Sequence, residues 1–250
     1  MTAARGDPAR AAIVLDFDGT LAPIVDDPAR AEPHPEVVKV LAGLSGQWGR
    51  VAVVSGRPVA YLLGRLGGRA GAELYGLYGM ERALPNTSAV QVAPEAEEWR
   101  QVVSDAASEA VARAPAGVEV EPKGLAVTLH FRSAPRLQTE TETLAAQLSR
   151  ETGLLADSGK MSVELRPPVE HDKGTVLRSL ASGCVAVLFA GDDRGDLPAF
   201  AELARLREKG LATLGVAAGG PETPAEVEEA ADLVVDGPQG VVELLSRLRL

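Results

Sequence analysis

Short apolar runs alternate with segments of helical periodicity near both ends of the chain. A short apolar run bounded by turn residues is typical of a buried strand. In the segments between these runs, apolar residues recur every three or four positions, as Val37, Leu41 and Leu44 do, which predicts amphipathic helices. The expected strands are 13–15, 51–54, 74–78, 185–190, 212–216 and 233–235, and the expected helices are 36–47, 58–66, 172–180, 197–208 and 241–248. This alternation predicts a parallel sheet covered by helices.

The middle of the chain has a different pattern. Apolar and polar residues alternate over 118–123, 127–132 and 161–166, which predicts strands with one apolar face and one polar face. Helices are expected over 95–113 and 136–151, with a weaker strand over 154–157. This order of elements predicts an antiparallel sheet with helices on its apolar face.

Together the two patterns predict an α/β fold with an inserted α+β domain. The predicted core comprises residues 1–83 and 168–250, and the predicted insert spans 84–167. Residues 1–11 are rich in alanine and arginine, and we expect them to form a polar tail without regular structure.

Two acidic residues follow the first predicted strand. Asp16 comes directly after Leu15, and Asp18 lies two positions further on. In open α/β sheets, ligands bind outside the carboxyl ends of the strands. Because a buried carboxylate is costly unless its charge is compensated, a second acid so close favours a bound cation. The spacing indicates a Mg2+ site beside an aspartate nucleophile, although for Asp18 taken alone the cap of a turn would be the favoured interpretation.

The segment Asp16-Phe17-Asp18-Gly19-Thr20-Leu21 resembles the first motif of the haloacid dehalogenase (HAD) superfamily. Its extension, Leu21-Ala22-Pro23-Ile24 and then Asp26-Asp27-Pro28, resembles the trehalose-6-phosphate phosphatase branch. The resemblance covers nearly the whole chain. It implies a HAD-like Rossmannoid core with an αββαββ cap, an active site between the two, and hydrolysis of trehalose 6-phosphate.

The resemblance also implies a role for each acid. Asp16 would attack phosphorus, and Asp18 would protonate the leaving oxygen and then activate water. The metal ligands would be Asp16, Asp192 and the backbone carbonyl of Asp18, an oxygen-only set that suits Mg2+. Asp192 lies in Gly191-Asp192-Asp193-Arg194-Gly195-Asp196, which resembles motif four. In that motif, Asp193 or Asp196 would reach metal-bound water or hold Lys173.

Two further segments match motifs two and three. Ser55, Gly56 and Arg57 follow the second predicted strand and would bind phosphate, because a hydroxyl can donate and glycine lets the backbone approach closely. Taken alone, Ser55 could simply cap a helix, and Arg57 could be solvated. Lys173 would bridge Asp16 and the phosphate. A lysine in the first turn opposes the helix dipole, which favours this role over that of an ordinary surface lysine.

Charged residues on the polar faces of the insert strands resemble the family's cap. We expect these residues to bind substrate: Glu121, Lys123, His130, Arg132 and Glu164. Carboxylates beside cations offer the acceptors and donors that sugar hydroxyls need. An ordinary solvated sheet face is the alternative interpretation.

The composition limits which classes of molecule the protein can bind and indicates where in the cell it acts. A net charge of −10 argues against nucleic acid or an anionic membrane as the main partner. The single cysteine, Cys184, excludes an intramolecular disulfide. With no apolar leader or membrane-length run, we expect a cytoplasmic monomer acting on a small sugar phosphate. Alternative functions are a phosphatase for sucrose or glucosylglycerate phosphate, a phosphohexomutase, and, least favoured, a phospho-acceptor receiver domain.

Overall fold

The computed structural model describes residues 6–25, 30–159 and 161–249, so the predicted Asp26-Asp27-Pro28 extension lies outside the described residues. The chain divides into two compact units. One is Val92–Glu170, and the other comprises the described residues before and after it. The sequence pattern placed the insert at 84–167. The two units, called the core and the insert below, are considered separately.

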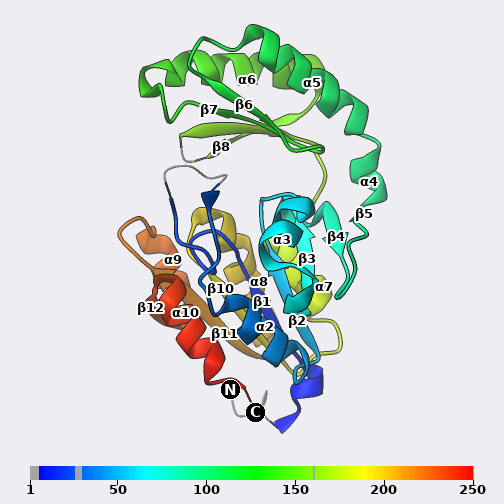
Figure 1. Ribbon diagram of the computed structural model, residues 1–250, viewed down its shortest axis with the longest axis vertical. Helices are drawn as coiled ribbons and strands as arrows, with labels where there is room; N and C mark the ends of the chain where they lie inside the picture. Colours follow the sequence, from blue (N-terminus) through cyan, green and yellow to red (C-terminus); the bar gives the residue numbers. More distant parts are fainter. Residues whose placement is uncertain (1–5, 26–29, 160, 250) are drawn as a thin grey trace. The chain divides into compact units, whose positions relative to one another are not determined.

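The core is built on a mixed sheet with the strand order β12-β11-β10-β1-β2-β3-β4-β5 (Figure 1). The strands are β1 Ala11–Leu15, β2 Arg50–Val54, β3 Glu73–Gly76, β4 Glu81–Ala83, β5 Gln91–Val92, β10 Ala186–Gly191, β11 Ala212–Gly219 and β12 Leu233–Asp236. Neighbours from β12 to β3 pair in parallel, whereas β4 pairs antiparallel to β3. The predicted α/β class with a largely parallel sheet is therefore confirmed.

The ends of two predicted elements were wrong. Ala11 belongs to β1, where it pairs with Ala186, and Pro8–Arg10 forms a 3-10 turn, so this part of the chain is not an unstructured tail. The expected strand 74–78 ends at Gly76, because Leu77 and Tyr78 take left-handed backbone conformations, with φ of 48° and 59°. Extended strand geometry cannot continue through such residues.

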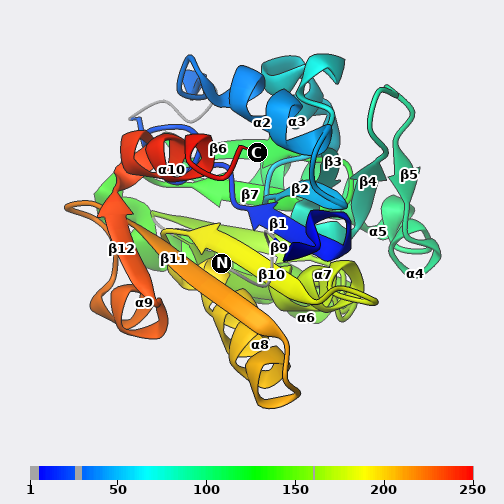
Figure 2. The ribbon, with the colours of Figure 1, turned by 90° about the horizontal axis from the view of Figure 1, so that it is seen from below.

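Helices cover both faces of the core sheet, as Figure 2 shows. Helices α2 Val37–Ser45, α3 Val59–Leu66 and α10 Gly237–Ser246 lie on one face, and α7 Lys173–Leu180, α8 Leu197–Glu208 and α9 Ala225–Ala230 lie on the other. Alternate residues of β1 pack on opposite faces of the sheet. Ile13 and Leu15 pack on the face covered by α2, α3 and α10, and Ala12 and Val14 pack on the face covered by α7, α8 and α9. Because β1 is buried on both faces, it reads as a continuous apolar run.

The insert is an antiparallel sheet with the strand order β6-β7-β9-β8 and helices packed against it. Its elements are α4 Pro94–Glu97, α5 Arg100–Arg113, β6 Glu119–Pro122, β7 Val127–His130, α6 Gln138–Thr152, β8 Leu155–Gly159 and β9 Ser162–Arg166. The predicted apolar face is confirmed, since Val127, Leu129 and Leu165 are buried against residues of α5 and α6. The single helix expected over 95–113 is divided into α4 and α5. No helix in the described ranges is long and apolar enough to cross a membrane.

Candidate active site

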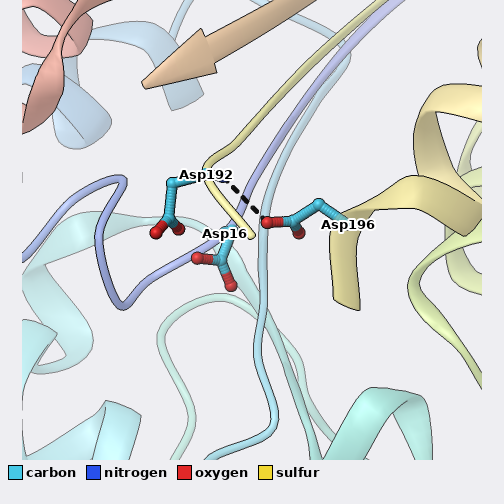
Figure 3. A group of neighbouring side chains, drawn as sticks. All are labelled: Asp16, Asp192 and Asp196. Carbon is cyan, nitrogen blue, oxygen red and sulfur yellow. Dashed lines mark hydrogen bonds between the residues drawn. The ribbon is translucent and has the colours of Figure 1, made fainter. Parts of the chain in front are cut away.

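The sheet order brings Asp16 next to Asp192. Strands β1 and β10 are parallel neighbours, with Leu15 opposite Ala190. The Asp16 amide continues this ladder and donates to the Ala190 carbonyl at 2.9 Å. The two acids therefore leave the sheet side by side. With Asp196 they form a group whose carboxylate oxygens lie within 4.8 Å of one another. Figure 3 shows the three carboxyl groups, one from the end of β1 and two from the turn after β10.

The loop after Asp16 lies directly against Asp192. Gly19 has φ of +82°, and a Cβ at this position would lie 2.0 Å from Asp192 Oδ2. Only glycine fits both the left-handed backbone and this approach. The buried Thr20 hydroxyl donates to Asp192 Oδ1 at 3.3 Å. The contact of Thr20 with Asp192 was not predicted from the sequence, in which the place of Thr20 in the Asp-Gly-Thr segment is the one available signal.

Lys173 is a buried cation shared by two acids. Its Nζ donates to Asp16 Oδ1 and to Asp196 Oδ1, both at 2.6 Å. Burial by itself would lower the pKa of Lys173, but Asp16 and Asp196 raise it well above its usual value. Lys173 is the first residue of α7, and Asp172 caps that helix by accepting from the Thr175 amide at 2.6 Å. The cap therefore fixes the start of the helix where Lys173 reaches Asp16.

Asp196, and not Asp193, holds Lys173. Asp196 is fully buried, and its second oxygen accepts from the backbone amides of Asp192 and Asp193 at 2.9 and 3.1 Å. Asp193 is exposed and caps the 3-10 turn Arg194–Asp196. The tight turn after β10 therefore presents Asp192 and Asp196 to the site.

The acids outnumber the cation that they surround. Burial raises the pKa of Asp16 well above its usual range, although Lys173 opposes this effect. Burial, together with the charges of Asp196 and Asp193, raises the pKa of Asp192 to about 7. A cluster of carboxylates that resists ionisation in this way fits a bound cation, and an all-oxygen donor set suits Mg2+.

The motif-two segment lies at the end of β2, beside the same loop. Ser55 is buried, and its Oγ accepts from the Arg57 amide at 3.1 Å. Gly56 lies under Tyr78, whose hydroxyl would be 2.8 Å from a Cβ at that position. The Arg57 guanidinium pairs with Asp18 at 2.8 Å. The structure thus brings together all the site residues predicted in the core.

The residues predicted on the insert form a cluster of their own. Lys123 Nζ lies 3.5 Å from Glu164 and 3.9 Å from Glu121, and His130 Nε2 lies 2.8 Å from Glu121. Thr128 stands opposite both Glu121 and Glu164 in the sheet. Within the described residues, Arg132 takes no part in these ion pairs.

Two polar atoms of this cluster are buried without a partner. The Thr128 hydroxyl and Glu164 Oε1 have no hydrogen-bond partner among the described residues. Burial raises the pKa of Glu164, although Lys123 opposes it. Buried polar atoms are nearly always hydrogen-bonded in folded proteins, so these two atoms require a partner that the described residues do not supply, either water or a polar ligand.

The fold of this chain is that of haloacid dehalogenase-like α/β proteins. A haloacid dehalogenase-like hydrolase from Bacteroides thetaiotaomicron superposes with a TM-score of 0.65 at 18% identity, covering 95% of this chain and 99% of that one. A trehalose-6-phosphate phosphatase related protein gives 0.79 at 21%, covering 95% and 96%. The trehalose-6-phosphate phosphatase C-terminal domain of C. albicans gives 0.76 at 24%, covering 98% and 94%.

Sequence comparison identifies the family. Residues 14–228 match the family model described as trehalose-phosphatase. The trehalose-phosphate phosphatase of Mycobacterium avium is 34% identical over 200 residues, which cover 76% of this chain and 50% of that protein. The Mycobacterium marinum protein of the same name is 33% identical over 205 residues, covering 76% and 51%. The chain therefore belongs to the trehalose-phosphatase family, and it spans about half the length of these curated relatives.

Proposed function

We propose that the protein hydrolyses trehalose 6-phosphate to trehalose and phosphate through a phosphorylated Asp16. The observation that carries this proposal is Asp16 itself, which is buried at the end of β1 with Lys173 Nζ 2.6 Å from one of its oxygens. A carboxylate nucleophile needs no activating base. The substrate follows from the relatives named as trehalose-phosphate phosphatases.

Each core residue has a part in the two steps. The Asp16 carboxylate attacks phosphorus, and the bond from phosphorus to the sugar oxygen breaks as Asp18 gives that oxygen a proton. Asp18 then takes a proton from water, which attacks the phosphoryl group on Asp16 and releases phosphate. Lys173 offsets the negative charge that gathers around Asp16. The Ser55 hydroxyl and the Gly56 backbone hold phosphoryl oxygens.

Asp16, Asp192 and the Asp18 backbone carbonyl would hold Mg2+. Both oxygens of Asp196 already accept hydrogen bonds, from Lys173 and from two backbone amides, so Asp196 supports the site and is not assigned as a ligand. Bound Mg2+ would offset the negative charge of the phosphoryl oxygens. The monomeric state and the cytoplasmic location stay predictions.

We further propose that the polar cluster of the insert binds the sugar. The predicted contacts are Glu121, Lys123, His130, Arg132 and Glu164. The unpartnered atoms of Thr128 and Glu164 support this assignment, because sugar hydroxyls could donate to Glu164 and either donate to or accept from Thr128.

Phosphate release from a panel of sugar phosphates tests the function. We expect trehalose 6-phosphate to be hydrolysed far faster than glucose 6-phosphate or sucrose phosphate, and Asp16→Asn and Asp18→Asn to abolish turnover in folded protein. Faster hydrolysis of another sugar phosphate would contradict the substrate assignment. Transfer of phosphate between sugar positions without release would indicate a mutase. Near-normal turnover by Asp16→Asn would exclude the covalent mechanism.

Variants of the insert test the sugar site separately. Each lost contact to a charged side chain costs on the order of 1.5–3 kcal/mol, so Glu121→Ala, Lys123→Ala and Glu164→Ala should cut hydrolysis of trehalose 6-phosphate roughly 10- to 100-fold. The same variants should leave hydrolysis of p-nitrophenyl phosphate unchanged, because that ester has no sugar. Glu140→Ala removes an exposed acid of α6 and is the matched control. Equal losses on both esters would assign the cluster a structural role.

A further inference from the structure

Arg57 holds both carboxylate oxygens of Asp18. Its Nε donates to Oδ2 at 2.8 Å and its Nη2 donates to Oδ1 at 3.0 Å. The side chain of Arg57 is 13% exposed and that of Asp18 is 29% exposed, so the pair is largely shielded from water. A two-point contact of this kind fixes the plane of the carboxylate as well as its distance, which a lysine cannot do.

Other side chains fix the guanidinium in turn. The face of Arg57 lies on Tyr61 of α3, with 4.6 Å between the guanidinium carbon and the ring centroid. The Tyr61 hydroxyl donates to the Ala31 carbonyl at 3.0 Å, and its ring meets Phe17 edge-on at 6.0 Å. Phe17 lies between Asp16 and Asp18 in the sequence. These contacts lead from Asp18 through Arg57 and Tyr61 back to the segment that carries both acids.

The backbone of Arg57 is held on both sides as well. Its amide donates to Ser55 Oγ at 3.1 Å, and its carbonyl accepts from the Leu77 amide at 3.0 Å. Leu77 and Tyr78 have positive φ, a costly conformation for residues other than glycine. Such strain persists only where the surrounding structure enforces it. The contact with Leu77 therefore fixes the position of the Arg57 backbone.

We infer that Arg57 is a positioning residue for Asp18 and not a ligand of the substrate phosphate. The Ser55-Gly56-Arg57 motif predicts that Arg57 binds phosphate, yet one edge of its guanidinium contacts Asp18 and its face lies on Tyr61. The inference rests on the proposed function, in which Asp18 gives a proton to the leaving sugar oxygen. Arg57 holds the carboxyl group in the orientation from which this transfer occurs.

The two possible roles of Arg57, positioning Asp18 or binding phosphate, predict different losses of activity when Arg57 is replaced. The difference depends on the leaving group of the ester. A sugar oxygen must gain a proton as it leaves, whereas p-nitrophenolate leaves without one. The value of kcat/KM covers only the steps up to the formation of phosphorylated Asp16. Loss of positioning therefore lowers kcat/KM for the sugar phosphate and spares the aryl phosphate. Loss of a phosphate ligand lowers both values, because the two esters carry the same phosphoryl group.

The experiment measures kcat/KM on both esters for the wild type, Arg57→Met, Arg57→Lys and Arg65→Met. We expect Arg57→Met to lose on the order of 10- to 100-fold on trehalose 6-phosphate, since two charged hydrogen bonds to Asp18 are removed, and to change little on p-nitrophenyl phosphate. Arg57→Lys should recover only a small part, because lysine restores the charge without the two-point contact. Inhibition by inorganic phosphate should be unchanged.

Arg65 provides the matched control. Its guanidinium lies 5.0 Å from the same Tyr61 ring, but its Nε donates to the Ala31 carbonyl at 3.0 Å. Arg65→Met should therefore keep the wild-type ratio between the two esters. Circular dichroism shows whether each variant folds, and Arg57→Lys serves as the test if Arg57→Met does not.

Three results would overturn the inference. Equal losses on both esters, or weaker inhibition by inorganic phosphate, would assign Arg57 to the phosphate. A loss on trehalose 6-phosphate alone in Arg65→Met, as large as that in Arg57→Met, would assign the effect to the support of Tyr61 and not to the contact between Arg57 and Asp18. If the wild type releases phosphate from neither ester, both the proposed function and this inference are overturned. The first two results overturn the inference alone, because in them the wild type is active.

Discussion

At the scale of one residue, Lys173 compensates the negative charge of two buried carboxylates, those of Asp16 and Asp196. Its side chain is buried and lies between two buried carboxylates, so removing it leaves their charges uncompensated. Breaking a buried ion pair from one side typically destabilises a protein by about 3–5 kcal/mol. The lysine therefore stabilises the fold of the site, in addition to the role in the reaction that we propose for it.

We accordingly expect Lys173→Met to lose turnover and to lower the free energy of unfolding by about 3 kcal/mol or more, as measured by urea denaturation in the presence of chelator. Lys39→Met is the control, because Lys39 is exposed and pairs with exposed Glu36; its effect should stay below about 1 kcal/mol. Normal turnover by a folded Lys173→Met variant would contradict the proposed role of Lys173 in the reaction.

At the scale of the element, the start of α7 places this lysine. Asp172 accepts from the Thr175 amide at 2.6 Å, and the Thr175 hydroxyl lies 3.0 Å from the Asp172 amide, which donates to it. The reciprocal cap fixes the first turn, and Lys173 is its first residue. The sequence predicts a helix that begins at Asp172, and the fold then decides that its first turn lies beside Asp16.

Asp172→Ala should therefore lower the free energy of unfolding by about 1 kcal/mol, the usual effect of losing an N-cap. It should also reduce kcat, because a frayed first turn no longer holds Lys173 between Asp16 and Asp196. Asp172→Asn, which can still cap, should recover most of both losses. Thermal unfolding and steady-state kinetics of the two variants provide the measurement; equal kcat for alanine and asparagine would separate the cap from catalysis.

Strand β9 carries a second feature that can be tested at this scale. Burial raises the pKa of Glu164 above its ordinary value of 4.5. As pH rises, the Glu164 carboxyl group therefore loses its proton at a lower pH in the unfolded chain than in the folded state. The stabilisation from this difference is fully present below the unfolded pKa and is lost as pH rises through the folded pKa.

The free energy of unfolding of the wild type should consequently fall, relative to Glu164→Gln, as pH rises from below the ordinary pKa of 4.5 through the raised pKa of the folded state. Urea denaturation across this pH range measures the difference, and Glu140→Gln, which changes an exposed side chain of α6, is the control. A constant difference between wild type and Glu164→Gln at every pH would contradict the raised pKa of Glu164.

At the scale of the whole molecule, the core gathers negative charge on a protein that is already acidic, with a net charge of −10. Asp16, Asp192 and Asp196 come together only when β1 and β10 pair, so the proposed ion would bind the folded chain and not the unfolded one. A ligand that binds only the native state stabilises it in proportion to the logarithm of its concentration.

We therefore expect Mg2+ to raise the melting temperature, with about 2.7 kcal/mol of stabilisation at a concentration one hundred times the dissociation constant. Chelator should abolish turnover and Mg2+ should restore it. Asp192→Asn should reduce the thermal shift, whereas Asp105→Asn, which changes an exposed acid of the insert, should not. Undiminished activity after thorough chelation would exclude the metal assignment.

The sequence by itself determined the elements and the faces of their strands. Ile13, Val14 and Leu15 identify a strand buried on both sides, and the acids that follow it had to lie at its carboxyl end. Alternation in 127–132 and 161–166 assigned Leu129 and Leu165 to the apolar core of the insert. Such features are local, because backbone periodicity fixes which side chains share a face.

Only the tertiary structure decided which distant side chains meet. Lys173 and Asp16 are separated by 157 positions, and the choice of Asp196 over Asp193 as the second partner depends on the turn after β10. The pairing of Arg57 with Asp18, and the left-handed Leu77 that ends β3, likewise depend on neighbouring segments. The physical reason is that hydrogen-bond geometry is set by strand order and close packing, which no local pattern of hydrophobic and polar residues contains.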